Sequence, residues 1–308
     1  MKIRPVLIVF LSLLVLVHGY VGLRLWGMPG GEASDRITAL TAQGVTGAAL
    51  LATLLGLFLA RRTAPFKDVD IPLPDLPTAL DGFTIVQLSD IHVGPTIKGD
   101  YLEAIVSRVN GLNADAVAIT GDLVDGSVHE LAEHTEPLAR LQARHGVFFV
   151  TGNHEYYSGA LSWIEELRRL GLTVLLNEHV ALDHDGHAVT LAGVTDYSAH
   201  LFHDDHRSDP HAALAGAPEH GPKVLLAHQP RSAKAAADAG FHLQLSGHTH
   251  GGQFWPWNHF VPLQQPFVAG LKRLGELWVY TSRGTGYWGP PMRFGAPSEI
   301  TRVRLRRA

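Results

Sequence analysis

The stretch Phe-Thr-Ile-Val-Gln-Leu-Ser-Asp-Ile-His, residues 83–92, joins a short apolar run to two side chains that can bind metal. Residues 83–89 are apolar and partly β-branched, which predicts a buried strand. Asp90 and His92 follow directly. Because successive side chains of an extended segment alternate in direction, we expect both to lie on the same side of it. The stretch therefore predicts a strand that ends in a pair of ligands.

Short apolar runs of this kind recur along the chain and alternate with segments of helical pattern. Such alternation predicts an α/β domain with buried sheets. The predicted strands are 83–89, 114–120, 147–151, 188–194, 223–227 and 241–246, with closing strands at 277–281 and 300–305. The predicted helices are 101–110, 128–144, 160–170 and 232–239. Prolines mark residues 63–82 as a linker or edge segment, so the catalytic domain is expected at 83–308.

Candidate ligands stand just past the predicted strands. The motifs are Asp90-Ile91-His92, Gly121-Asp122, Gly152-Asn153-His154-Glu155, His228 and Gly247-His248-Thr249-His250. Sites in α/β sheets form at the carboxyl ends of strands, so we expect these side chains to meet. The chain has no cysteine. A metal must therefore be held by nitrogen and oxygen ligands.

The five motifs, in this order, resemble those of the calcineurin-like metallophosphoesterases, which are dinuclear metal hydrolases. The resemblance runs from about residue 83 to the carboxyl terminus and implies a four-layer α/β/β/α sandwich. It implies two metal-binding sets that share Asp122 as a bridge: Asp90, His92, Asp122 and His250, and Asp122, Asn153, His228 and His248. It also implies that His154 contacts the substrate phosphate and assists the leaving group.

The expected chemistry is hydrolysis of a phosphodiester or pyrophosphate bond by a metal-bridging hydroxide. Two metal ions about 3.5–4 Å apart clamp a phosphoryl group and lower the pKa of a bound water. A protonated His154 stabilises or protonates the departing group. The cofactor is expected to be two divalent ions. Histidine, aspartate and asparagine ligands suit Mn²⁺, with Fe or Zn²⁺ as alternatives.

An apolar anchor is predicted over residues 1–62. Two stretches, about 5–26 and 37–60, reach the roughly 20 residues that a membrane-spanning helix needs. The alternative for the first stretch is a cleaved signal peptide, with Lys2 and Arg4 as its basic region. Both stretches as helices would make this a multi-pass membrane protein, with the catalytic domain preceded by two transmembrane helices.

Basic residues near the helix ends predict the orientation, because such residues favour the cytoplasmic side. Lys2 and Arg4 precede the first stretch, and Arg61, Arg62 and Lys67 follow the second. Both ends of the anchor are therefore expected in the cytoplasm, with the catalytic domain at the inner (plasma) membrane. The formal charge of −4 gives no basic field, so nucleic acid is not an expected partner.

Four of the six tryptophans lie between Trp255 and Trp288, with arginines and lysines interleaved. These aromatics either contact lipid headgroups or pack the second sheet, and both interpretations stay open. With the anchor they favour the bilayer as a partner and a phosphorylated lipid-linked or small-molecule substrate. The resemblance is closest to the membrane-anchored bacterial branch, which implies cleavage of UDP-2,3-diacylglucosamine. The alternatives are a membrane-tethered phosphodiesterase of soluble nucleotides and a non-catalytic ligand-binding membrane sensor.

Other polar residues are also candidates for metal binding. His200, His203 and His206 are spaced by three among aspartates, which is compatible with a third metal site. A solvated polar insertion is the preferred interpretation. Asp196 ends a predicted strand and is expected near the rim of the site, without being a ligand.

Overall fold

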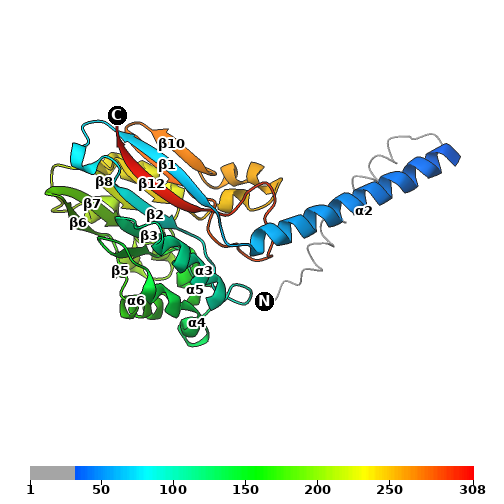
Figure 1. The fold of residues 1–308 in the computed structure, drawn as a ribbon, viewed down its shortest axis with the longest axis horizontal. Coiled ribbons are helices and arrows are strands. Elements are labelled where there is room, and N and C mark those ends of the chain that lie inside the picture. The colour runs from blue at the N-terminus through cyan, green and yellow to red at the C-terminus, as the bar shows by residue number, and fades with distance from the viewer. Residues whose placement is uncertain (1–31) are drawn as a thin grey trace.

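The computed structural model describes residues 32–308. Helix α2 (Glu32–Arg61) projects away from the globular part of the molecule (Figure 1). Within the described residues, one helical segment, Thr38–Arg61, is long and apolar enough to cross a membrane. It corresponds to the predicted span 37–60. The other predicted span, 5–26, lies outside the described residues.

The first sheet holds strands from both ends of the catalytic region. Its order is β1-β12-β2-β3-β4-β5, and β12 pairs antiparallel with β2 whereas the other neighbours pair parallel. Its strands are β1 (Phe66–Leu73), β2 (Thr84–Leu88), β3 (Ala116–Thr120), β4 (Val147–Val150), β5 (Thr173–Val174) and β12 (Ile300–Arg307). The parallel β2–β3–β4 group brings three of the candidate ligand loops to one edge.

The second sheet supplies the other ligand loops. Its order is β10-β11-β9-β8-β7-β6, with a parallel centre and an antiparallel strand at each edge. Its strands are β6 (Glu178–His184), β7 (His187–Gly193), β8 (Lys223–Leu226), β9 (Leu243–Ser246), β10 (Gly270–Leu274) and β11 (Leu277–Thr281). Both sheets are thus mixed, because each contains parallel and antiparallel strand pairs.

Helices cover the outer face of each sheet. The helices beside the first sheet are α3 (Gly99–Asn110), α4 (Val128–Thr135), α5 (Asn153–Ser158) and α6 (Ala160–Arg169). Those beside the second are α7 (Pro210–Ala213) and α8 (Ala233–Ala239). The domain therefore has four layers in the order helix, sheet, sheet, helix.

Alternation along the central strands explains these layers. In β3, Val117 and Ile119 join the apolar cluster under α3 and α6, whereas Ala116 and Ala118 join the cluster between the two sheets. A strand buried on both faces reads as a continuous apolar run, which is how these strands were predicted. A third cluster, with Leu225 from β8, lies between the second sheet and α8.

The structure corrects one predicted helix and decides between two interpretations of the segment before the first predicted strand. The predicted helix 128–144 ends at Thr135 and continues only as a 3-10 turn, Glu136–Arg140. Pro137 has no N–H to donate and cannot lie inside an α-helix. The segment 63–82 was predicted as a linker or edge segment, and the edge interpretation holds: it contains strand β1, which forms the edge of the first sheet and pairs with β12 along eight residues.

Candidate metal centre

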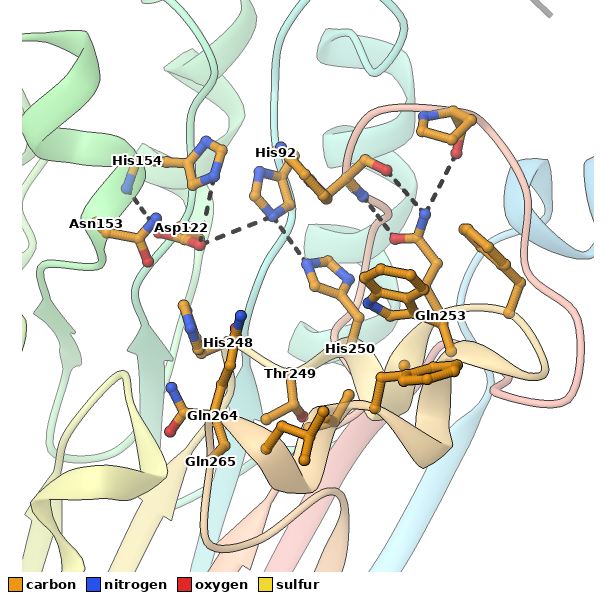
Figure 2. A pocket seen from close by; sticks show the side chains of 18 of the residues that line it. His92, Asp122, Asn153, His154, His248, Thr249, His250, Gln253, Gln264 and Gln265 are labelled. Atoms are coloured by element: carbon orange, nitrogen blue, oxygen red, sulfur yellow. Dashed lines mark hydrogen bonds and ion pairs between the residues drawn. The ribbon is translucent and has the colours of Figure 1, made fainter. Parts of the chain in front are cut away.

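The predicted ligands gather at the carboxyl ends of strands from both sheets. Asp90 and His92 follow β2, Asp122 follows β3, and Asn153 begins α5 after β4. His228 follows β8, and the pair His248 and His250 follows β9. Figure 2 shows five of them, His92, Asp122, Asn153, His248 and His250, at one cavity of about 630 Å³. The arrangement at strand ends is the one that the sequence predicted.

One group of candidate ligands comprises Asp90, His92 and His250, all buried. The Nε2 atoms of His92 and His250 lie 3.0 Å apart, and His250 Nε2 lies 3.5 Å from Asp90 Oδ1. Ligands that share one cation at bonds of about 2.0–2.2 Å stand about 3 Å from one another. The spacing of this group therefore fits a single metal ion.

A second group comprises Asp122, His228 and His248. His228 Nε2 lies 3.1 Å from Asp122 Oδ2 and 3.2 Å from His248 Nδ1. Asp122 Oδ2 also lies 4.0 Å from His92 Nε2 in the first group. Asp122 is thus the carboxylate between the two groups, which is where a bridging ligand would stand. His248 and His250 face different groups although one residue separates them.

Asn153 gives an independent test of whether a metal fits. Its side chain is buried, and its Oδ1 atom has no hydrogen-bond partner. A buried amide oxygen without a partner costs free energy, so such atoms need an explanation. Asn153 lines the cavity together with Asp122 and His248. The residues present therefore fit a second cation bound by Asp122, Asn153, His228 and His248.

The backbone at these loops is unusual, and it corrects the reason given above for Asp90 and His92. Their φ angles are 52° and 57°, and those of Asp122, His248 and His250 are 51°, 69° and 51°. All five lie in the left-handed region, which non-glycine residues adopt rarely. The two ligands after β2 therefore do not share a side through extended alternation. They converge because the chain coils tightly at the strand end.

Electrostatics favour neutral imidazoles at two of the ligand positions. Burial, with the nearby His228 adding to it, lowers the pKa of His248 to about 3. Burial likewise holds the pKa of His250 well below its usual range, and the charges of His92 and Arg293 act in the same direction. Neutral imidazole is the form that binds a metal, so the electrostatics of the site favour the ligand form of both rings.

His228 and Asp122 form the opposite case, a buried ion pair. Burial disfavours charge on His228, but the adjacent Asp122 carboxylate outweighs this and raises the pKa of His228 well above its usual range. Burial also opposes charge on Asp122, yet His228 holds the pKa of that carboxyl well below its usual value. The Nδ1 atom of His228 lies 2.8 Å from the carbonyl oxygen of Thr120, which directs Nε2 toward Asp122. Metal binding here would release the proton from Nε2.

Comparison with known proteins agrees with this geometry. The profile of the calcineurin-like phosphoesterase family matches residues 83–252. The chain belongs to this family. It is 42% identical over 261 residues to a Danio rerio transmembrane protein with metallophosphoesterase domain, covering 82% of this chain and 60% of that protein. An uncharacterized metallophosphoesterase of Helicobacter pylori (strain J99) is 41% identical, covering 72% of this chain and 59% of the relative.

This chain thus spans about 60% of the length of those two curated relatives. A shorter relative, an uncharacterized metallophosphoesterase of Aquifex aeolicus, is 33% identical over 72% of this chain and 84% of its own length. The family and the names of these relatives show that this chain has the domain of a metal-dependent phosphohydrolase. Two relatives are named as transmembrane proteins, and helix α2 of this chain is long and apolar enough to cross a membrane.

His154, the predicted catalytic residue, faces the same cavity from the start of α5. Its Nδ1 lies 2.6 Å from Asp125 Oδ1, and its Nε2 lies 4.0 Å from Asp122 Oδ2. Burial disfavours the protonated ring, but the hydrogen bond to Asp125 and the nearby carboxylates outweigh it and raise the pKa of His154 to about 9. Without bound metal the ring therefore carries a proton at neutral pH, and it faces the cavity.

Asp125 is a site residue that the sequence analysis missed. Besides His154, its Oδ1 lies 2.9 Å from Nδ1 of His92. One carboxylate therefore orients both a candidate ligand and the candidate acid. The signal was present, because Asp125 stands three residues after Asp122 in the same strand-end loop. A carboxylate on the outer nitrogen of a ligating histidine is a common arrangement in metal sites.

Glu155 is the second residue that was missed. Its buried carboxyl accepts hydrogen bonds from the backbone N–H groups of Asp122, Leu123 and Gly152 at 3.0, 2.8 and 2.6 Å. It joins the loop after β3 to the loop after β4, so it holds Asp122 and Asn153 in register. Within the motif Gly152-Asn153-His154-Glu155, the glutamate thus has a structural role.

The remaining polar candidates lie apart from the two metal groups. Asp196 is buried and accepts hydrogen bonds from Ser198 and Gln229, and it does not line the cavity. His206 Nδ1 lies 2.8 Å from the hydroxyl of Tyr156. Among the described residues, the groups spaced to hold a metal include none of His200, His203 and His206.

Proposed function

We propose that this protein hydrolyses a phosphodiester or pyrophosphate bond of a lipid-linked substrate at the cytoplasmic surface of the inner membrane. The observation that carries the proposal is one cavity that joins three things: the metal-binding groups, an exposed apolar wall and a loop bonded to the membrane helix.

The inner end of the cavity supplies the chemistry. Two bound divalent cations, here proposed to be Mn²⁺, would neutralise phosphate charge and lower the pKa of a coordinated water. Asp122 would hold both cations in place. His154 would bind a phosphate oxygen and pass the proton on its Nε2 to the leaving group, while Asp125 keeps the ring oriented. General acids of this kind contribute about 10²–10⁴-fold to a rate.

The outer part of the cavity is apolar. Trp257, Phe260, Leu263 and Trp288 line it and are 58%, 50%, 82% and 55% exposed. Large apolar side chains that gather on a surface mark a site for an apolar partner. Of the tryptophans between Trp255 and Trp288, Trp278 instead packs toward the core between the sheets. Trp278 therefore fits the packing interpretation, and we propose lipid contact only for the exposed residues that line the cavity.

The membrane helix passes close to this wall. The backbone N–H of Arg293, in the loop after Trp288 and Pro290, donates to the carbonyl of Gly56 in α2 at 3.0 Å. Gly56 lies five residues before Arg61, the end of the membrane segment, or about 7.5 Å along the helix axis. Since the hydrocarbon core is about 30 Å thick and the 24-residue segment is about 36 Å long, this loop would meet the bilayer interface.

A lipid-linked phosphate would suit such a site, because its apolar chains contact the wall while its phosphate reaches the cations. UDP-2,3-diacylglucosamine is the leading candidate, on the resemblance to the membrane-anchored bacterial branch. Exposed apolar side chains along α2, including Leu51 and Phe58, favour contact with lipid. The basic residues Arg61 and Arg62 at the end of the helix favour a cytoplasmic catalytic domain. A reporter fused after Ala308 should then read as cytoplasmic, and a periplasmic signal would overturn this topology.

The substrate is tested with the full chain in detergent or nanodiscs, supplied with Mn²⁺. Hydrolysis of UDP-diacylglucosamine, bis-p-nitrophenyl phosphate and cyclic nucleotides is compared between the wild type and Leu263→Ser. The matched control is Leu161→Ser, since Leu161 is 52% exposed on α6 and does not line the cavity. Leu263→Ser should raise KM for the lipid-linked substrate several-fold and leave the soluble diester unchanged.

Other outcomes identify the alternatives. Equal rates on soluble and lipid-linked phosphates, with no effect of Leu263→Ser, would indicate a membrane-tethered phosphodiesterase of soluble nucleotides. No hydrolysis of any substrate with Mn²⁺, Fe²⁺ or Zn²⁺, while ligand binding persists, would indicate a membrane sensor.

A further inference from the structure

A loop between β11 and β12, here called the strap (residues 287–294), borders the cavity through Trp288 and Pro290. Figure 1 shows this part of the chain crossing the inner end of α2. The metal chemistry proposed above does not use it. Its hydrogen bonds nevertheless reach both the membrane helix and the loop that bears His250.

The first connection is made by Gln253, three residues after His250. Its Nε2 donates to the carbonyl of Trp288 at 2.8 Å, and its Oε1 accepts from the N–H of Trp288 at 2.8 Å (Figure 2). The carbonyl of Gln253 accepts from the N–H of Phe294 at 3.1 Å. The Gln253 side chain is buried. The strap and the ligand loop therefore move together.

The second connection is the side chain of Arg293, which is completely buried. Its guanidinium donates to the carbonyls of Gly286 (2.6 and 2.9 Å), Ala296 (3.1 Å) and His250 (3.3 Å). Its Nη2 also lies 3.0 Å from His250 Nδ1. Within the described residues, no carboxylate forms an ion pair with it. Burial of an unpaired charge is costly, so this fork of hydrogen bonds is what keeps Arg293 in place.

The third connection is the contact with α2. Besides the bond from the Arg293 N–H to the Gly56 carbonyl, a Cβ at position 56 would lie 2.6 Å from Met292 Cγ. A side chain at position 56 would therefore force Met292 of the strap to move. Gly56 is buried, whereas its neighbours Leu54 and Leu55 are exposed. By contrast, nothing lies within 4 Å of a Cβ built at Gly47 of the same helix.

We propose that Arg293 is a positioning residue for the metal ligand His250, and that the membrane helix sets its position through Gly56. The backbone of Arg293 is hydrogen-bonded to α2, and its side chain is hydrogen-bonded to the loop that bears His250. A shift of α2 that displaces the strap would therefore also displace the ligand loop. Loss of a partner behind a metal ligand typically costs about 10–100-fold in metal affinity or activity. Because a guanidinium only donates, the connection that can hold His250 while its Nε2 binds a metal is the bond from Arg293 Nη1 to the His250 carbonyl. The proposal rests on the metal centre and does not depend on a lipid substrate.

The test is a comparison of Gly56→Leu with Gly47→Leu in the full chain. Binding of Mn²⁺ to the chelated protein is measured by calorimetry, and turnover is measured on bis-p-nitrophenyl phosphate. Gly56→Leu should weaken one of the two Mn²⁺ sites on the order of 10-fold, because His250 belongs to one group of ligands only. Gly47→Leu should bind both ions as the wild type does.

Two further variants separate positioning from general damage to the fold. Gly56→Ala places a Cβ against Met292, and adding Met292→Ala should restore the weakened site. Arg293→Lys keeps the charge but loses the several hydrogen bonds of the guanidinium, so it should weaken the same Mn²⁺ site relative to the wild type. Unchanged affinity at both sites in Gly56→Leu and Arg293→Lys, or equal weakening of both sites without rescue by Met292→Ala, would overturn the proposal.

Discussion

Replacing Gly152 by alanine is the substitution that tests the centre most directly without removing a ligand. Its φ of −100° and ψ of −176° are open to any residue, so alanine adds no backbone strain. The difficulty is space. A Cβ at this position would lie 2.2 Å from Asp122 Oδ1 and 2.4 Å from the Asp122 nitrogen.

The size of the effect follows from these contacts. Non-bonded carbon and oxygen atoms stay more than about 3.3 Å apart, so Asp122 or Gly152 must move by about 1 Å. Metal sites tolerate ligand displacements of about 0.2 Å, which is far less. Overpacking of this kind costs about 1–3 kcal/mol, a fraction of the stability of a domain. We therefore expect Gly152→Ala to fold, to lose bound metal and to lose activity by about 100-fold or more.

The assay is metal content per chain by mass spectrometry, with thermal unfolding and phosphodiester hydrolysis on the same sample. Gly111→Ala is the matched control, because Gly111 has a φ of −65° and its nearest contact would be 3.5 Å. It should match the wild type in all three measurements. A Gly152→Ala protein that holds two metals and hydrolyses the diester at the wild-type rate would refute the assignment of Asp122 as a bridge.

Three further predictions concern the acid and the metals. His154→Ala should keep both metals but lose about 10²–10⁴-fold in rate, and loss of metal in this variant would contradict a role in proton transfer. In the chelated protein, protonated His154 should stabilise the fold fully below about pH 6.5 and lose this effect as pH rises through about 9. The variant Asp125→Asn should bring the pKa of His154, measured by NMR, back toward 6.5. An unchanged pKa would exclude Asp125 as the cause of the shift. Chelation should lower the melting temperature, since a ligand at 100 times its Kd stabilises by about 2.7 kcal/mol, and Mn²⁺ should restore it.

The sequence was sufficient to place the ligands because they follow strands that are buried on both faces. Such strands read as unbroken apolar runs, and β2, β3, β4, β8 and β9 all coincide closely with predicted segments. The weaker strands escaped prediction for a physical reason. β6 has only two buried residues and includes Glu178, Asp183 and two histidines, and β5 has only two residues. Their pairing depends on neighbours that are distant in sequence.

The contacts behind the ligands were beyond the reach of the sequence for the same reason. Arg293 is 43 residues from His250, and Gly56 is 237 residues from Arg293. An arginine in an aromatic segment reads as a surface residue, and only the fold shows that it is completely buried. Asp125 differs, because its spacing from Asp122 was visible. It was passed over because one more aspartate in a loop is ordinary turn chemistry.

The left-handed conformations at the ligands explain why the correct residues were found through a partly wrong argument. Each costs about 1 kcal/mol or more in a non-glycine residue, so five of them cost at least about 5 kcal/mol, comparable to the net stability of a domain. Hydrogen bonds between loops offset this cost: the N–H groups of Asp90 and His92 bond the carbonyls of Gly121 and Asp122, and the N–H of His248 bonds the Asp90 carboxylate. The ligand loops are thus fixed to one another by the protein itself. Metal ions would add to an arrangement that the strand ends already hold. The positions of the ligands after the strands therefore predicted the site, although the extended backbone expected at Asp90 and His92 was wrong.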